Sequence, residues 1–199
     1  MTTTVSEQLD ESKEISLWEC LHDGSLDEVS SDLMARSLTL VVDVPYHWEF
    51  YQLPSDTRFR IVLEGTRTVE ALRFEPWPGQ RDIPRTTPWE EAEKQRQFDY
   101  SMGRLESTDW SEFVSQVQAE EGYEILHAAL KIESQSALLL RLEVLSYPNS
   151  TFRELCLQAE RLRVFVGPER ELSLEEFLKF GNAYWEEFSA RAAKLKGST

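Results

Sequence analysis

Residues 126–144 read LHAALKIESQSALLLRLEV, and this stretch decides the fold. Apolar side chains occupy every second position on either side of the polar residues 133–136. A period of two is typical of a β-strand with one buried face, and four polar residues suit the connection of a hairpin. The stretch therefore predicts two antiparallel strands, with these positions facing the core: Leu126, Ala128, Leu130, Ile132, Leu138, Leu140, Leu142 and Val144.

The same period of two recurs at residues 38–44, 59–63, 69–74 and 155–166, after a short strand at 26–29. We expect one hairpin of 26–29 with 38–44, and a second of 59–63 with 69–74 that turns at Gly65. The apolar positions change parity within 69–74 and within 155–166, which predicts β-bulges near Ala71 and near residues 160–161. The total is about seven strands, and their short links favour antiparallel pairing.

Two helices are expected between the two groups of strands. Thr87, Pro88 and Glu90 form a helix start with a capping box, and the polar sequence that follows predicts a helix on the surface. A second helix is expected to begin near Asp109 and to end at Gly122, with an amphipathic stripe.

A third helix closes the chain. Ser173 and Glu176 form a capping box at its start. We expect its apolar face to cover one face of the sheet or one mouth of a barrel. The residues of that face are Leu174, Phe177, Leu178, Gly181, Trp185, Phe188, Ala192 and Leu195.

These patterns predict an α+β fold that is predominantly antiparallel β. About seven strands are expected as a sandwich or open barrel, with a loop and helical insert at 77–121 and the C-terminal helix packed on the sheet. Residues 15–199 are expected to form a single domain, because one amphipathic helix in the insert cannot make its own core. Residues 1–14 are expected to be a disordered acidic tail, since they have no hydrophobic periodicity.

The composition is that of a globular protein with a strong negative charge. The chain has 199 residues, of which 41% are apolar, and its formal net charge is −15. A nucleic-acid-binding surface or electrostatic attachment to anionic membranes is not expected of such a chain, because both need clustered Lys and Arg. Residues 1–32 hold nine acidic residues and one lysine, which favours a protein partner with a basic surface.

Several classes of site and location are disfavoured by the sequence. There are two cysteines, too few for a disulfide framework, and no secretory signal or membrane-spanning run of apolar residues. We therefore expect a cytoplasmic protein of bacterial type. The three histidines show no metal-ligand spacing, and no nucleotide-binding glycine motif is present, so no metal site and no cofactor are expected.

The first candidate site is the turn of His22, Asp23 and Gly24, where Gly24 tolerates a positive φ and Asp23 can cap the turn. His22 is either exposed at a ligand or partner site or bonded to backbone. As neighbours in an extended chain, His22 and Asp23 are expected to point to opposite sides. Cys20 would share a face with His22 on a strand, which permits a thiolate–imidazolium pair, although a buried Cys20 in the core is the simpler interpretation.

Loop aromatics form a second group of candidates. His47, Trp48 and Tyr51 lie in a loop outside the periodic strands, and Trp77 lies in another. Such side chains can form a binding hot spot, or they can close the end of a sheet. Four arginines on the polar face of the second expected hairpin either bind an anion or pair with acidic residues on neighbouring strands: Arg58, Arg60, Arg67 and Arg73.

The four residues Leu21-His22-Asp23-Gly24, followed by a strand at Leu38-Thr39-Leu40, carry a resemblance. The chain resembles small uncharacterised bacterial proteins in which a Leu-His-Asp-Gly/Ala motif precedes a β-hairpin, some of them similar to immunity proteins of toxin systems. The resemblance covers about the first 75 residues. It implies a β-rich fold and a protein that binds and neutralises a cognate toxin without catalysis.

Three function classes remain open. The favoured hypothesis is a non-catalytic protein-interaction module, and an immunity-like protein would be one form of it. The alternative is a small-ligand-binding protein, with a pocket between sheet and C-terminal helix lined by Phe59, Leu142, Phe177 and Trp185. The third is a hydrolase-type enzyme that uses the region of Cys20, His22 and Asp23.

Overall fold

The computed structural model describes residues 14–196, except 33, 46–49, 52, 55, 77, 81, 120–121, 135 and 147–150, and it leaves the side chains of 192, 195 and 196 undescribed. Of the tail expected at 1–14, only Glu14 is among the described residues. Glu14 begins a short strand that pairs with the middle of the chain, with Lys131 opposite it.

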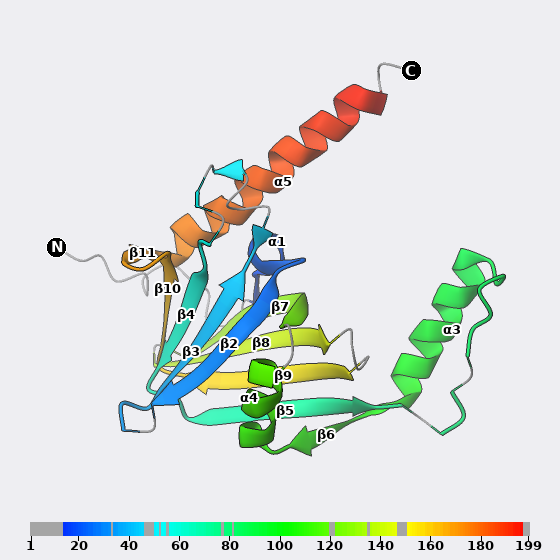
Figure 1. Ribbon diagram of the computed structural model, residues 1–199, viewed down its shortest axis with the longest axis horizontal. Helices are drawn as coiled ribbons and strands as arrows, with labels where there is room; N and C mark the ends of the chain where they lie inside the picture. Colours follow the sequence, from blue (N-terminus) through cyan, green and yellow to red (C-terminus); the bar gives the residue numbers. More distant parts are fainter. Residues whose placement is uncertain are drawn as a thin grey trace.

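The described strands form a single sheet of eleven strands (Figure 1). All of their pairings are antiparallel, so the expected α+β fold with a predominantly antiparallel sheet is confirmed, whereas the expected count of about seven strands is wrong. The strands are β1 (Glu14–Ser16), β2 (Ser25–Asp32), β3 (Ser37–Asp43), β4 (Phe59–Glu64), β5 (Thr68–Glu75), β6 (Arg104–Thr108), β7 (Tyr123–Ser134), β8 (Ala137–Ser146), β9 (Thr151–Ala159), β10 (Arg161–Val166) and β11 (Arg170–Leu172).

The sheet is open and strongly bent. Its order is β11-β10-β4-β3-β2-β7-β8-β9-β5-β6, with β1 beside β7. In Figure 1 the strands β2, β3 and β4 run diagonally, while β5, β8 and β9 run almost horizontally across them. The result is one open sheet rather than the two sheets of a sandwich. These two groups of strands form the two halves of the sheet. Inward-facing residues of both halves belong to one hydrophobic core, among them Leu40, Ile61, Leu142 and Leu157.

One expected strand and one expected hairpin are wrong at the corner where the two directions of strands meet. The strand expected at 155–166 is two strands, because β9 pairs with β8 and β5 whereas β10 pairs with β4 and β11. The second expected hairpin does not form either, since β4 pairs with β3 and β10. The chain passes this corner twice, near Gly65 and near Glu160, where strands leave one half of the sheet and enter the other.

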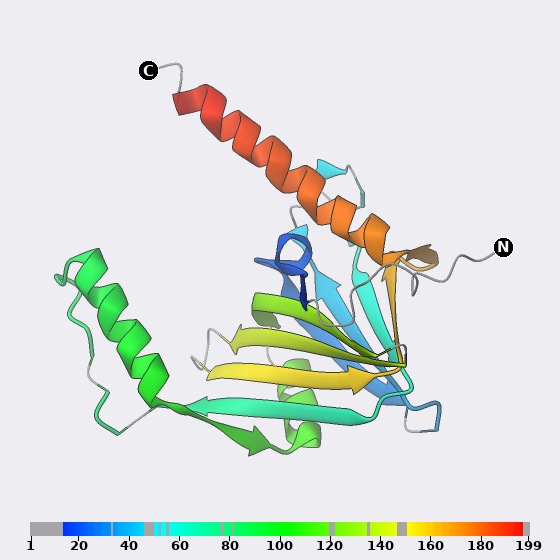
Figure 2. The same cartoon turned by 180° about the vertical axis from the view of Figure 1, so that it is seen from behind.

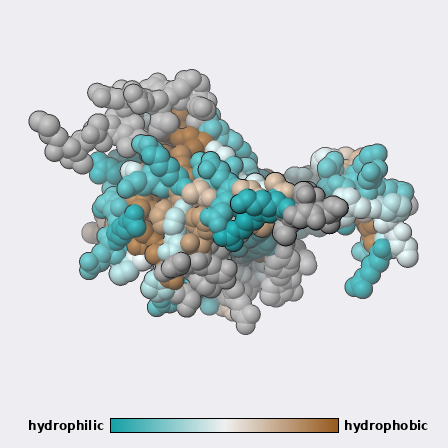
Figure 3. Space-filling view, turned by 90° about the horizontal axis from the view of Figure 1, so that it is seen from above, coloured by the Kyte–Doolittle hydropathy of each residue, from teal (hydrophilic) through white to brown (hydrophobic). Residues whose placement is uncertain are grey.

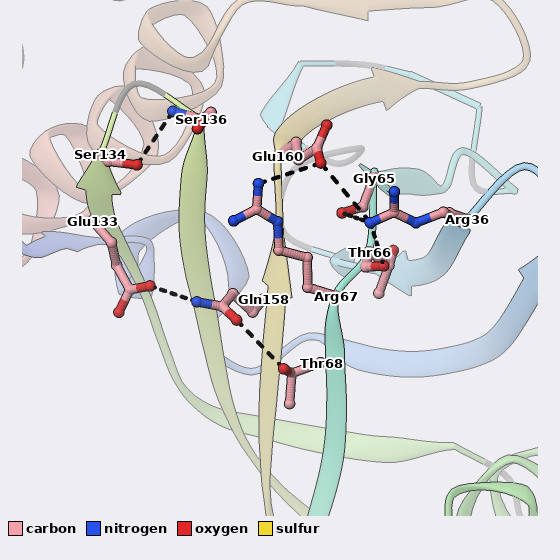
Figure 4. A network of polar contacts seen from close by, with 10 residues as sticks. All are labelled: Arg36, Gly65, Thr66, Arg67, Thr68, Glu133, Ser134, Ser136, Gln158 and Glu160. Carbon is pink, nitrogen blue, oxygen red and sulfur yellow. Dashed lines mark hydrogen bonds and ion pairs between the residues drawn. The ribbon is translucent and has the colours of Figure 1, made fainter.

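Polar side chains hold the corner together (Figure 4). Arg67 donates a hydrogen bond of 3.3 Å to Glu160, and Arg36 approaches the same carboxylate at 3.9 Å. Arg36 also donates to the carbonyl of Thr66. These side chains come from three separate segments, so they connect the two passes of the chain through the corner.

The described helices are α1 (Trp18–Leu21), α3 (Trp89–Met102), α4 (Trp110–Ala119) and α5 (Leu174–Lys196). The capping box of α5 is confirmed, because the backbone N–H of Ser173 donates to Glu176 and that of Glu176 donates to the Ser173 hydroxyl. Asp109 caps α4 by accepting two backbone N–H groups. The start expected near Thr87 is found, but no side chain caps α3.

Helix α5 covers the sheet with its first half only. Phe177 is fully buried, and α5 packs against α1, β10 and β11. Phe188, which we expected on the same buried face, is 52% exposed. Figure 2 shows the second half of α5 projecting away from the sheet.

Candidate functional site

The Leu21-His22-Asp23-Gly24 motif forms the turn between α1 and β2. Leu21 is fully buried, and Asp23 takes the left-handed conformation with φ of 57°. Gly24 is required for close backbone approach, because a Cβ there would lie 2.8 Å from the Leu21 carbonyl oxygen and 3.0 Å from that of Asp43. The positive φ that we expected at Gly24 is found at Asp23 instead.

His22 and Asp23 contact each other, contrary to expectation. The His22 Nδ1 lies 3.1 Å from Asp23 Oδ2, because the left-handed backbone at Asp23 brings the two side chains to the same side. The His22 ring also lies 4.0 Å from the ring of Trp18 and 5.6 Å from that of Trp185, measured between centroids. The imidazole is thus packed between α1 and α5.

An aromatic seam joins α5 to the segments beside it. Trp18 and Trp185 stack at 5.4 Å, and Trp185 Nε1 donates a 3.0 Å hydrogen bond to the Glu19 carbonyl. Tyr51 donates a 2.8 Å hydrogen bond to the Phe180 carbonyl, and its ring packs on Phe180. The structure therefore brings two predicted site residues, His22 and Tyr51, to the same helix, where they serve its packing.

Three predicted site residues, His47, Trp48 and Trp77, lie outside the described residues.

Cys20 is a core residue. Its side chain is buried, and its Sγ donates a 3.2 Å hydrogen bond to the Phe177 carbonyl. Burial raises the pKa of the Cys20 thiol to about 12, so the thiol is protonated at neutral pH. This geometry does not support a nucleophile at Cys20, because α1 places the thiol in the core rather than on a face shared with His22.

Raising the pH above about 9 should lower the free energy of unfolding, because Cys20 stays protonated in the folded protein. The ordinary pKa is 9.0 and the folded value is about 12. The folded protein therefore retains a proton that the unfolded chain loses, and stability falls as the pH rises from about 9 to about 12, by at most about 1.4 kcal/mol per pH unit. Urea unfolding of the native protein and of Cys20→Ala across this range checks the prediction. If the free energy of unfolding fell equally steeply with pH in both proteins, the prediction would be contradicted.

Arg58 and Arg67 pair with acidic residues across the sheet, as the cross-strand interpretation predicts, whereas Arg73 pairs along its own strand. Arg58 lies 2.9 Å from Asp27 and 3.1 Å from Asp43. Arg67 pairs with Glu160 and Arg73 with Glu75, while Arg60 donates to the Pro168 carbonyl and lies over the Phe165 ring. These contacts leave no support for an anion-binding strip.

Three of the four residues expected to line a pocket beneath the C-terminal helix lie in the hydrophobic core. Phe59, Leu142 and Phe177 are fully buried in the core, with the rings of Phe59 and Phe177 5.6 Å apart. Trp185 belongs to the seam with α1. The residues proposed to line a cavity are therefore packed against protein atoms.

The described residues of 76–103, which exclude 77 and 81, form an arm that ends in α3. In Figure 1 this arm stands to the side of the sheet at the tip of β5 and β6, and Figure 3 shows it projecting from the body with a mixed surface. Helix α3 buries only Ala92 and Asp99. Large hydrophobic side chains on α3 remain exposed: Trp89 by 71%, Phe98 by 50%, Tyr100 by 50% and Met102 by 51%.

A pocket of about 430 Å³ lies at the base of the arm. Its walls are Phe74, Gln80, Asp82, Ile83, Arg96, Asp99 and Tyr100. The rings of Phe74 and Tyr100 stack at 5.0 Å, and both rings meet Phe152 edge-on. This ring cluster attaches α3 to the outer face of the sheet.

Gly103→Ala is expected to loosen the arm. A Cβ at Gly103 would overlap the ring of Phe74 and approach the Glu75 carbonyl oxygen at 3.1 Å. The Phe74 ring would have to move, and its stacking on Tyr100 would be lost, at a cost of about 1–2 kcal/mol. Amide hydrogen exchange should become faster in α3 and remain unchanged in β7 and β8. The exposed Ser101→Ala is the matched control, and an unchanged α3 in Gly103→Ala would contradict the prediction.

Sequence reasoning placed α3 on the surface, which is confirmed, but it did not single out its hydrophobic residues. Trp89, Phe98, Tyr100 and Met102 follow no 3.6-residue stripe, so no single face can bury them all. That mismatch between hydrophobicity and periodicity was the available signal.

Within the described ranges, no group of three or more His, Cys, Asp or Glu side chains is placed to hold a metal ion. No helix in those ranges is long and apolar enough to cross a membrane. No known protein family, no curated protein and no solved structure matches the chain.

Proposed function

We propose that this protein is a non-catalytic protein-interaction module that binds a partner with a basic surface through the α3 arm. The observation that carries the proposal is the exposure of Trp89, Phe98, Tyr100 and Met102 on one helix. Trp and Tyr are enriched among the residues that dominate binding energy at protein interfaces, and Met is enriched at interfaces generally. Among the described residues, the large hydrophobics exposed elsewhere are Met34, Leu105 and Phe188.

The position of the arm supports this role. Helix α3 is anchored at its C-terminal end by Tyr100 on Phe74, while most of its other side chains face solvent. An exposed apolar surface on a helix that contributes little to the core has no evident structural purpose. The fold is therefore expected to tolerate replacement of these exposed apolar side chains by polar ones.

Charge indicates the kind of partner. The chain carries a net charge of −15, and α3 itself has four acidic and two basic residues. Apolar anchors surrounded by negative charge fit a partner whose binding face is basic. Such binding is expected to weaken as salt is added, because ions screen the attraction.

The test compares a triple variant of the arm with the native protein. Partners are recovered with tagged native protein, and the affinity of the recovered partner is then measured for Trp89→Ser/Phe98→Ser/Met102→Ser. We expect a loss of at least about thirtyfold, which corresponds to about 2 kcal/mol at a hot spot. Tyr100 is left intact so that the arm keeps its attachment.

Met34→Ser/Phe188→Ser is the matched control, since it removes two exposed hydrophobic side chains that lie outside the arm. It should bind the partner with native affinity. A partner that binds both variants equally, or whose affinity does not respond to salt, would contradict the proposal.

Small-ligand binding is a second candidate, supported by the pocket at the base of the arm. Stacked aromatic rings and the charged groups of Asp82, Arg96 and Asp99 suit a small ligand with a ring and polar substituents. A ligand that raises the melting temperature of the native protein but not of Tyr100→Ala would favour this function over the first.

A further inference from the structure

Among the described strands, β6 forms one edge of the sheet. It is the last strand in the sheet order, and in Figures 1 and 2 it lies along the lower border. Its first four residues are exposed, and Leu105 shows 38% of its surface to solvent. An edge strand offers unpaired backbone N–H and C=O groups, so it can accept another strand.

The charges on β6 continue a pattern that begins on β5. Glu75 lies opposite Arg104, and Arg73 lies opposite Glu106, so each pair across the two strands has opposite signs. Arg104 and Glu106 also form an ion pair along β6. Leu105 is on the other face of the sheet, opposite Phe74.

A second copy of β6 completes this pattern. If two β6 strands pair antiparallel about a two-fold axis at Leu105, each Arg104 lies opposite Glu106 of the other copy, and the two Leu105 side chains lie opposite each other. One row of side chains would then read Glu75, Arg104, Glu106 and Arg73 across four strands, with alternating signs. The register is self-complementary, as a two-fold interface requires.

We propose that this protein forms a symmetric dimer by antiparallel pairing of β6 with β6 of a second copy, which joins the two sheets into one. Opposite charges that face each other across neighbouring strands stabilise the pair, and like charges in the same places oppose it. Five residues make a small interface, so the expected dissociation constant is about 1–100 μM. At physiological salt the repulsion between two acidic chains is screened beyond about 8 Å.

Two charge reversals test the register. In Arg104→Glu, acidic residues face each other in both rows, and in Glu106→Arg, basic residues do. Each variant alone is expected to be monomeric in sedimentation equilibrium, with dimerisation weakened at least about tenfold. An equimolar mixture of the two should dimerise, because Glu at 104 and Glu at 106 of one chain then face two arginines of the other.

Leu105→Glu is an independent variant that keeps both charges and is also expected to be monomeric. Arg170→Glu reverses a charge on β11, at the opposite end of the sheet, and should dimerise as the native protein does. Circular dichroism confirms that each variant retains its sheet. A native protein that is monomeric up to about 0.1 mM, charge reversals that still dimerise alone, or a mixture that stays monomeric would each overturn the proposal.

Discussion

Gly181→Ala is expected to destabilise the protein by about 2 kcal/mol, although alanine is the better helix former. Gly181 lies on α5 where the helix crosses α1. A Cβ added there would overlap the Glu19 carbonyl group and lie 2.7 Å from the backbone nitrogen of Cys20. Both neighbours are backbone atoms of another helix, so neither can move aside by rotating a side chain.

To make room for the Cβ, α5 would have to move away from α1, and this movement would break two contacts that hold α5 on α1. These are the hydrogen bonds from Trp185 Nε1 to Glu19 and from Cys20 Sγ to Phe177. Urea unfolding measures the loss. Ala190→Gly, on the exposed part of α5, is the control and should cost about 1 kcal/mol through helix propensity alone. A Gly181→Ala protein as stable as the native one would show that α5 is not docked at this position.

Arg153→Ala is expected to cost about 3 kcal/mol. Arg153 is 2% exposed and lies beneath α4, where it donates to the Thr108 hydroxyl and to the Gln116 side-chain carbonyl. Its guanidinium also lies 5.7 Å from the ring centroid of Phe113. Alanine would leave a cavity and remove the donor from both acceptors.

Arg153→Met separates packing from charge. In the described part of the chain, the guanidinium donates to the neutral side chains of Thr108 and Gln116, and no ion pair with a carboxylate is present there. Methionine retains most of the volume and removes the cost of burying that charge. Its expected cost is below about 1 kcal/mol. If methionine and alanine destabilised the protein equally, the charge itself would be the stabilising feature.

The local pattern of the sequence predicts strands and caps well. Alternation at 126–144 marks β7 and β8, which pair as expected, and the hairpin of β2 with β3 also forms. Ser173 and Glu176 mark the start of α5 because capping depends on residues only three positions apart. These features are settled by neighbours along the chain.

Pairing between distant strands could not be predicted in the same way. No residue in β4 signals that its neighbour is β10, about a hundred positions away. The bulge expected near Ala71 is absent, since the register of β5 with β9 is continuous there. The parity changed because Leu72 and Phe74 lie on the outer face, where Tyr100 covers Phe74. Strand β6 was missed because residues 104–108 do not alternate in hydrophobicity.

The candidate site shows the same limit. The sequence predicts His22 and Tyr51 as binding residues, yet both pack against α5. Their role depends on contacts with a helix more than a hundred residues away. The hydrophobic residues of α3 are exposed because the helix departs from the sheet, which no local sequence pattern reports.

Hydrogen–deuterium exchange of the native protein, with and without its recovered partner, tests the central claim most directly. If the α3 arm is the binding surface, the amides of residues 89–102 become protected in the complex, while those around His22 and Tyr51 exchange at their free rates. Protection confined to the seam between α1 and α5, with α3 unchanged, would contradict the account and return the binding site to the turn at His22 and Asp23.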